Sequence, residues 1–220
     1  SKTARTVLCA LAACFASVLT SSLPAHSAPA WRPSVADRRF DLQLSTPFNL
    51  SRRADLVALE LFGTGAERLE RLRARGIATL CHLAAGLWEN WRPDAPSYPT
   101  EALGRSPSGW QGQRWLDLRH QGLRPILEQR LELCRQRGFK GVLFAKVTGG
   151  GAAAAATGFD IAPAQTLAFA RWLAEAAHAR GLAAGILGGH RPEVWISDRY
   201  AGQQELGQVH QVCLAHVLRD

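Results

Sequence analysis

Apolar residues fall into two kinds of segment along this chain. Short apolar runs predict six strands, at 40–44, 55–62, 77–83, 140–147, 182–187 and 206–213. The run at 55–62 is nearly continuous, which is typical of a strand buried on both faces, whereas 40–44 alternates apolar and polar residues. Longer segments repeat apolar residues every three or four positions and predict helices at 66–75, 122–137 and 164–180. A further short helix is predicted at 191–200.

Glycine and proline mark the ends of the predicted helices. Gly76, Gly138 and Gly181 follow the last turns, where glycine commonly ends a helix. Pro163 stands at the start of the third helix, where its missing N–H costs nothing. Strands that alternate with helices indicate a parallel sheet with helical cover, the α/β class. A closed barrel of this class has eight strands, so six strands predict a TIM-like (β/α) barrel that is incomplete at the C-terminus.

The N-terminus has the pattern of an export signal. Lys2 and Arg5 precede an apolar run at 7–19, and small residues at 24–28 suit cleavage. The apolar run is too short for a strong membrane span, and no second apolar span follows it. We therefore expect a secreted or periplasmic protein without a membrane span. Cys14 follows Leu-Ala-Ala, so lipid attachment at Cys14 is the less favoured alternative.

The predicted domain organisation has three parts. Residues 1–28 are assigned to the signal peptide, 29–38 to a linker and 39–220 to a single (β/α) barrel domain. The chain is 47% hydrophobic and 20% charged, which is ordinary for a globular protein with a sizeable core. The sequence does not fix the oligomeric state.

The charge of the chain argues against a nucleic-acid partner. Its formal net charge is +8, and nearly all of its cations are arginines. These arginines are scattered among acids, as in ERLERLRAR at 67–75. Nucleic-acid binding calls for basic residues clustered on one face, so we expect no nucleic-acid partner.

Three cysteines follow the signal segment, at Cys81, Cys134 and Cys213. In an oxidising compartment one pair can form a disulfide and one cysteine is left over. The sequence leaves the pairing open. The spacing is not that of a zinc site, and we expect neither a metal nor another cofactor.

A tryptophan-rich segment at 81–118 separates the third predicted strand from the second helix. Four of the seven tryptophans lie in it, at Trp88, Trp91, Trp110 and Trp115. Long loops are usually functional or disordered, and disordered loops are poor in aromatic residues, so we expect this loop to be ordered. Aromatic faces beside arginine and carboxylates are typical of a sugar-binding cleft. The alternative is that the tryptophans cap the core beneath the loop.

The candidate substrate-binding residues come from this loop and from nearby strand ends. They are Trp88, Glu89, Trp91, Arg92, Asp94, Trp115 and Asp117, together with His82 and His210. The structural alternative for Arg92 is an ion pair with Asp94 or Asp117.

Several segments together resemble one known family. They are 40–44, 58–64, 88–94, 114–117 and 171–181, with Cys81 and Cys134. From about Trp31 to Cys213 the chain resembles glycoside hydrolase family 114, the endo-α-1,4-polygalactosaminidases. The resemblance implies a (β/α) barrel with a cleft at the carboxyl ends of its strands. It also implies a galactosamine-containing polysaccharide as partner, cleaved by a pair of carboxylates.

The chain departs from the family pattern at the positions that carry chemistry. The resemblance places the two catalytic carboxylates on Ala145 and Gln211. Glycoside cleavage needs one carboxylic acid to protonate the leaving oxygen and a second carboxylate as nucleophile or base. Neither an alanine nor a glutamine can take these roles. We therefore expect a protein that binds the polysaccharide but is catalytically impaired.

Other readings of the site stay open. Glu60, near a strand end, could replace a missing carboxylate, and a rearranged pair of Glu60 with Glu89 would make an active glycosidase. Glu60 could equally be paired with a neighbouring arginine or with Lys146, and Lys146 could bind an anion. Glu60, His82 and His210 could in principle form a metal site. A truncated, inactive fragment with an open sheet edge is the remaining alternative.

Overall fold

Five parallel strands form the centre of the structure. The computed structural model describes residues 39–44, 48, 49, 51, 53–107, 109, 111–148, 152–187, 194–197 and 209–212. The sheet order is β1-β2-β3-β6-β7, formed by β1 (Phe40–Gln43), β2 (Leu56–Glu60), β3 (Ala78–Ala84), β6 (Gly141–Ala145) and β7 (Ala183–Leu187). Every neighbouring pair in this sheet is parallel. The predicted α/β class with a parallel sheet is confirmed.

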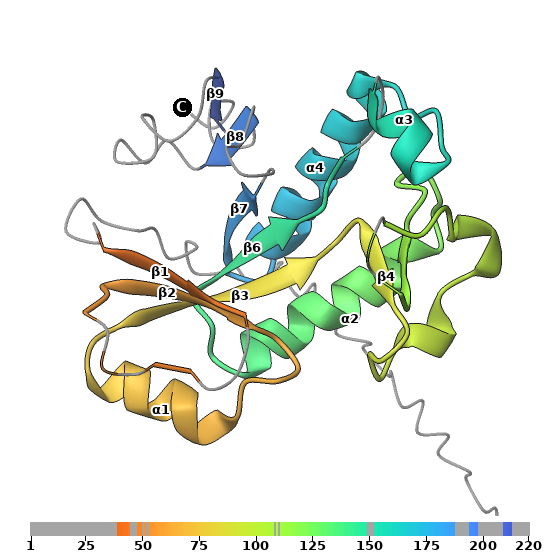
Figure 1. Ribbon diagram of the computed structural model, residues 1–220. Helices are drawn as coiled ribbons and strands as arrows, with labels where there is room; N and C mark the ends of the chain where they lie inside the picture. The colour runs from red at the N-terminus through yellow and green to blue at the C-terminus, as the bar shows by residue number, and fades with distance from the viewer. Residues whose placement is uncertain are drawn as a thin grey trace, which may run out of the picture.

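Three amphipathic helices cover one face of this sheet. They are α1 (Ala66–Ala74), α2 (Leu123–Gln136) and α4 (Pro163–His178), close to the predicted bounds. Their apolar stripes join one core with the strand residues of that face, among them Leu59 and Phe144, which are almost fully buried. A short helix, α3 (Ala152–Thr157), lies between β6 and α4 (Figure 1). None of the helices that the structure describes is long and apolar enough to cross a membrane.

The opposite face of the sheet carries a second apolar cluster of Leu56, Ala58, Leu80 and Leu143. We call this the inner face. Side chains alternate between the two faces along a strand, and paired residues of parallel neighbours point to the same side. The register aligns Glu60 with His82, and Ala84 with Ala145 and then Leu187. The inner face therefore begins apolar and ends, at the carboxyl edge, with Glu60, His82 and Ala145.

The tryptophan-rich segment contains regular structure of its own. An antiparallel pair, β4 (Leu87–Glu89) with β5 (Gln113–Trp115), follows β3, and two 3-10 turns, η1 (Ala95–Ser97) and η2 (Thr100–Ala102), lie between its strands. In Figure 1 β4 lies beyond the arrowhead of β3. The loop is thus ordered over its described residues and is held at the carboxyl edge of the sheet.

The short helix predicted at 191–200 is wrong. A strand, β8 (Val194–Ser197), lies there and pairs in parallel with β9 (Val209–Val212), within the last predicted strand. Valine, tryptophan and isoleucine are residues that favour a strand, and the partner strand comes from a later part of the chain. Polar residues flank this short apolar run on both sides, so the segment did not show the pattern of a buried strand.

A disulfide joins β3 to α2 through Cys81 and Cys134, both fully buried, with a Cα–Cα distance of 6.0 Å. The sequence had left this pairing open. Cys213 lies outside the described residues. Because 53 positions separate the two cysteines, the bridge removes much conformational freedom from the unfolded chain. Loop-closure entropy for that length corresponds to about 4 kcal/mol.

Replacing both bridged cysteines, Cys81→Ala with Cys134→Ala, should lower the melting temperature by roughly 8–16 °C, because about 4 kcal/mol is lost in a domain of this size. Thermal unfolding followed by circular dichroism measures the change. Cys213→Ser leaves the bridge intact and is the control. Equal melting temperatures for the double variant and the unaltered protein would contradict the entropic role of the bridge.

Candidate functional site

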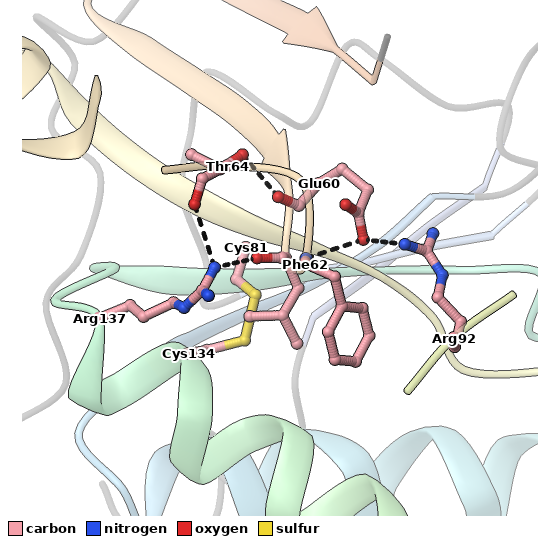
Figure 2. Close-up of a disulfide and its surroundings, with 8 residues drawn as sticks. Glu60, Phe62, Thr64, Cys81, Arg92, Cys134 and Arg137 are labelled. Carbon is pink, nitrogen blue, oxygen red and sulfur yellow. Dashed lines mark hydrogen bonds and ion pairs between the residues drawn. A yellow bond between two sulfur atoms is a disulfide. The ribbon is translucent and has the colours of Figure 1, made fainter. Parts of the chain in front are cut away.

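Glu60 closes the turn between β2 and α1. One carboxylate oxygen, Oε1, accepts the N–H of Phe62 at 3.0 Å, and the other, Oε2, accepts the N–H of Gly63 at 2.5 Å. The Thr64 hydroxyl donates to the backbone carbonyl of Glu60 at 2.6 Å. From the other side, Arg137 donates to the carbonyl oxygens of Leu61 and Thr64 (Figure 2). The acid side chain is therefore used to shape its own loop.

Arg92 joins Glu60 to a second carboxylate. Its Nη1 lies 2.7 Å from Oε1 of Glu60 (Figure 2). Its Nε donates to Oε2 of Glu89 at 2.6 Å. Glu89 is buried and also accepts from the Gln113 amide at 3.1 Å. Both carboxylates thus have donors on their oxygens, and one guanidinium bridges the β2 loop to the β4–β5 pair. A sugar would have to compete with these bonds.

The predicted partners of Arg92 were wrong. Asp94 pairs instead with Arg130, whose Nε and Nη2 donate to its two oxygens at 2.6 and 2.8 Å. Asp117 pairs with Arg119 at 2.8 and 2.9 Å. Burial raises the pKa of Asp117, but the hydrogen bonds and charge of Arg119 outweigh it and hold this pKa below its usual range. Arg92 instead contacts Glu89, three positions before it, and Glu60 at the end of β2.

The Phe62 ring lies close to two guanidinium groups. The guanidinium carbons of Arg92 and Arg130 are 5.2 and 5.3 Å from its centre, within the range of cation–π attraction. Arg130 also lies 5.5 Å from the ring of Tyr98, where burial raises the phenol pKa to about 12. These contacts fix the tryptophan-rich loop against the sheet and α2.

His82 stands beside Glu60 on the inner face. Burial lowers the pKa of His82 to about 4; the charges of Arg92 and Lys146 lower it further, and the charge of Glu60 opposes them. The imidazole is therefore neutral at physiological pH. Neutral imidazole offers one donor and one acceptor nitrogen to a ligand.

Ala145 and Lys146 occupy the end of β6, next to His82's strand. The Ala145 carbonyl accepts the N–H of Ala85 at 2.9 Å, and the Ala145 methyl is buried. Lys146 has a left-handed backbone with φ of 63° and an exposed side chain. A β-carbon on Gly86 would lie 1.9 Å from the Lys146 carbonyl oxygen, so only glycine fits there. The lysine is thus held in a conformation that costs about 1–2 kcal/mol.

The described tryptophans of the loop differ in exposure. Trp91 is 52% exposed, beside Arg92. Trp88 packs against the core and donates its indole N–H to the Ala95 carbonyl at 3.0 Å, as the structural alternative foresaw for such rings. Trp115 is half-buried in β5. Of these three, Trp91 presents the largest exposed fraction to a ligand.

The remaining predicted residues lie farther along the chain. His210 and Gln211 are in β9, aligned with Trp195 and Ile196 of β8. Trp110 lies outside the described residues. Across the described ranges, no group of three His, Cys, Asp or Glu side chains could hold a metal ion.

Sequence reasoning missed Arg130, although a signal existed. It occupies the apolar stripe of α2 with Leu127, Leu131 and Cys134, where a charged residue must find a partner. Phe62 and Gly86 gave no comparable signal, because their roles depend on contacts with distant segments.

Comparisons with known proteins identify the family. Residues 20–189 match the sequence profile of glycoside-hydrolase family GH114, so this chain belongs to that glycoside hydrolase family. No curated protein matches the sequence significantly. The TIM-like (β/α) fold predicted from the sequence agrees with this family and with the structural similarities described next.

Two solved structures share the fold. The Aspergillus fumigatus protein Ega3, in complex with galactosamine, has a TM-score of 0.67 and 26% sequence identity, covering 84% of this chain and 70% of Ega3. The glycoside hydrolase domain of PelA from Pseudomonas aeruginosa has a TM-score of 0.51 and 15% identity, covering 79% of this chain and 66% of that domain. This chain therefore spans about two thirds of the length of these relatives.

Arg92→Met should destabilise the fold by about 3 kcal/mol, because two largely buried carboxylates lose their shared cation. Urea denaturation measures the change in the free energy of unfolding. Arg71→Met is the matched control, since Arg71 pairs with Glu67 on the exposed surface of α1 and such pairs contribute little. Adding Glu60→Gln and Glu89→Gln to Arg92→Met should restore part of the loss. Equal effects of the Arg92 and Arg71 variants would contradict the bridge.

The pKa of His82 predicts a pH dependence of stability. The pKa of His82 is 6.5 in the unfolded chain and about 4 in the folded protein. At a pH between these two values, the unfolded chain binds the proton and the folded protein does not. The free energy of unfolding therefore has its full value, as far as His82 is concerned, above pH 6.5. It decreases by about 3 kcal/mol as the pH falls towards 4. His82→Gln should flatten the curve over that interval. An imidazole that titrates near 6.5 by NMR would contradict the prediction.

Proposed function

We propose that this protein binds a galactosamine-containing polysaccharide at the carboxyl edge of its sheet and hydrolyses it poorly or not at all. The observation that supports poor or absent hydrolysis is the methyl group of Ala145 at the end of β6. The resemblance to the family puts a catalytic acid at this position. An alanine there can neither donate a proton nor stabilise a developing positive charge.

Binding is supported by the family and by the loop. Ega3, a relative of the same fold, was solved with galactosamine. The exposed Trp91 ring can stack on the apolar face of a sugar, and the neutral His82 at the carboxyl edge offers hydrogen bonds. Several ion pairs hold this loop in place before any ligand arrives, which reduces the entropy lost on binding.

A working glycosidase built on Glu60 and Glu89 is the less favoured function. Both carboxylates accept hydrogen bonds, and Arg92 occupies an oxygen of each. A general acid must hold a proton ready for the leaving oxygen, which conflicts with close contact to a permanently charged guanidinium. We therefore assign Glu60 and Glu89 to positioning the loop.

Export is a further part of the proposal. Residues 1–28 carry the pattern of a signal peptide, and the buried Cys81–Cys134 disulfide suits an oxidising compartment. A polysaccharide outside the cell is then an accessible partner.

The proposal is tested by incubating the protein with α-1,4-linked galactosamine oligosaccharides, both N-acetylated and not, and measuring reducing ends and products by mass spectrometry. The unaltered protein should give no products above the background. The double variant Ala145→Asp with Gln211→Glu should show measurable hydrolysis, because one general acid–base group is worth about 10²–10⁴-fold.

Calorimetry on the same samples tests binding. Trp91→Ala should weaken binding about tenfold, a loss of about 1.4 kcal/mol. Phe40→Ala is the matched control, because Phe40 is an equally exposed aromatic residue on β1. Release of reducing ends by the unaltered protein, abolished by Glu60→Gln, would refute the impairment and favour the rearranged pair.

A further inference from the structure

The loop between β1 and β2 carries an Asn-x-Ser motif, formed by Asn49 and Ser51 with Leu50 between them. When the middle residue is not proline, this motif is the acceptor sequence for N-linked glycans in exported proteins. The chain has only two asparagines, and the other, Asn90, is followed by tryptophan and arginine and so lacks the motif. A motif this short also occurs by chance, so the exposure and contacts of the asparagine amide decide whether it can be used.

Contacts on both sides hold Asn49 at the surface of the domain. Its backbone N–H donates to Oε1 of Gln43 at 2.8 Å, and its carbonyl oxygen accepts from Nε2 of Gln43 at 3.0 Å. The preceding residue, Phe48, packs against the main core, and the guanidinium carbon of Arg68 lies 3.8 Å from the centre of its ring. The backbone of Asn49 is thus tied to the end of β1 and to α1, whereas the residue itself is exposed.

The side-chain amide of Asn49 is oriented by Ser51. Its Oδ1 accepts the backbone N–H of Ser51 at 3.0 Å and the Ser51 hydroxyl at 2.6 Å. Because a backbone N–H can only donate, the amide oxygen and not the nitrogen must face Ser51. The amide nitrogen, Nδ2, makes no hydrogen bond with any residue in the described part of the chain. Ser51 is exposed as well, so an enzyme can reach both residues of the motif.

From the motif, its exposure and the orientation of the amide, we infer that Asn49 is the attachment site of an N-linked glycan. This inference rests on the export that forms part of the proposed function, because the transferase acts on chains that enter the secretory route. The donor is an oligosaccharide carried on a polyprenyl diphosphate. The bond between the anomeric carbon of its first sugar and the diphosphate oxygen breaks, and the diphosphate leaves with the electron pair. Nδ2 bonds to that carbon and loses one of its two protons.

The experiment expresses the protein in yeast in two forms. One is the full chain behind an initiator methionine, and the other has a well-characterised yeast secretory signal in place of residues 1–28. Secreted and cell-retained protein are compared by gel mobility before and after treatment with peptide N-glycosidase. We expect a mobility shift of one glycan that disappears on treatment. The tryptic peptide 40–52 contains Asn49 as its only asparagine, and removal of the glycan converts that residue to aspartate, which mass spectrometry locates.

Variants isolate the two residues of the motif. Asn49→Gln and Ser51→Ala should each abolish the shift, and Ser51→Thr should keep it, because threonine also satisfies the motif. Asn90→Gln is the matched control, since Asn90 is the other asparagine and is also exposed, and it should leave the shift unchanged. Circular dichroism confirms that each variant is folded.

The outcomes separate this inference from the proposed function. A shift that requires Asn49 and Ser51 but not Asn90, in both forms, supports the glycan and the export. An unmodified Asn49 in the form with the yeast signal overturns the inference and leaves the export and the polysaccharide binding standing. A glycan in that form alone supports the acceptor site and overturns export by residues 1–28. A shift that survives Asn49→Gln overturns the assignment to Asn49.

Discussion

The Arg92 guanidinium, held between the carboxylates of Glu60 and Glu89, is the interaction on which the carboxyl edge depends. It ties the β2–α1 turn to the β4–β5 pair, two segments that do not share a strand ladder. The Phe62 ring lies close both to this guanidinium and to that of Arg130, which ties the same loop to α2 through Asp94. Removing the cation would leave buried negative charge without a partner, which is costly in a low-dielectric environment.

This constraint explains why acidic residues near the site need not be catalytic. Four acids at this edge and in the loop pair with arginines, namely Glu60, Glu89, Asp94 and Asp117. Catalysis instead requires a carboxylate free to change its protonation state during the reaction. The strand-end position that the family resemblance assigns to such a group holds Ala145. The protein has the fold of its glycoside hydrolase family, and Glu60 and Glu89 at this edge share the guanidinium of Arg92.

The sequence predicted those features that depend on local pattern. The parallel strands and the three long helices were predicted because each has its own periodicity and glycine or proline boundaries. The strand at 194–197 was mistaken for a helix because its pairing with β9 involves a distant segment. The sequence analysis allowed an arginine partner for Glu60, but it did not identify Arg92, because Glu60 comes from β2 and Arg92 from the loop after β4. Glu89 is only three positions from Arg92, so that pairing was within reach of spacing and was overlooked. Contacts between distant segments are set by the fold, and spacing alone does not encode them.

The central claim is that this family member is a folded polysaccharide-binding protein whose site is formed before the ligand arrives. Thermal unfolding of residues 29–220, with and without α-1,4-linked galactosamine oligosaccharides, both N-acetylated and not, tests it most directly. A ligand that binds only the folded state stabilises it by about 2.7 kcal/mol at a hundredfold excess over Kd. The account predicts one cooperative transition that moves to higher temperature with the sugar. A cooperative transition that does not move with either form of the sugar would contradict it.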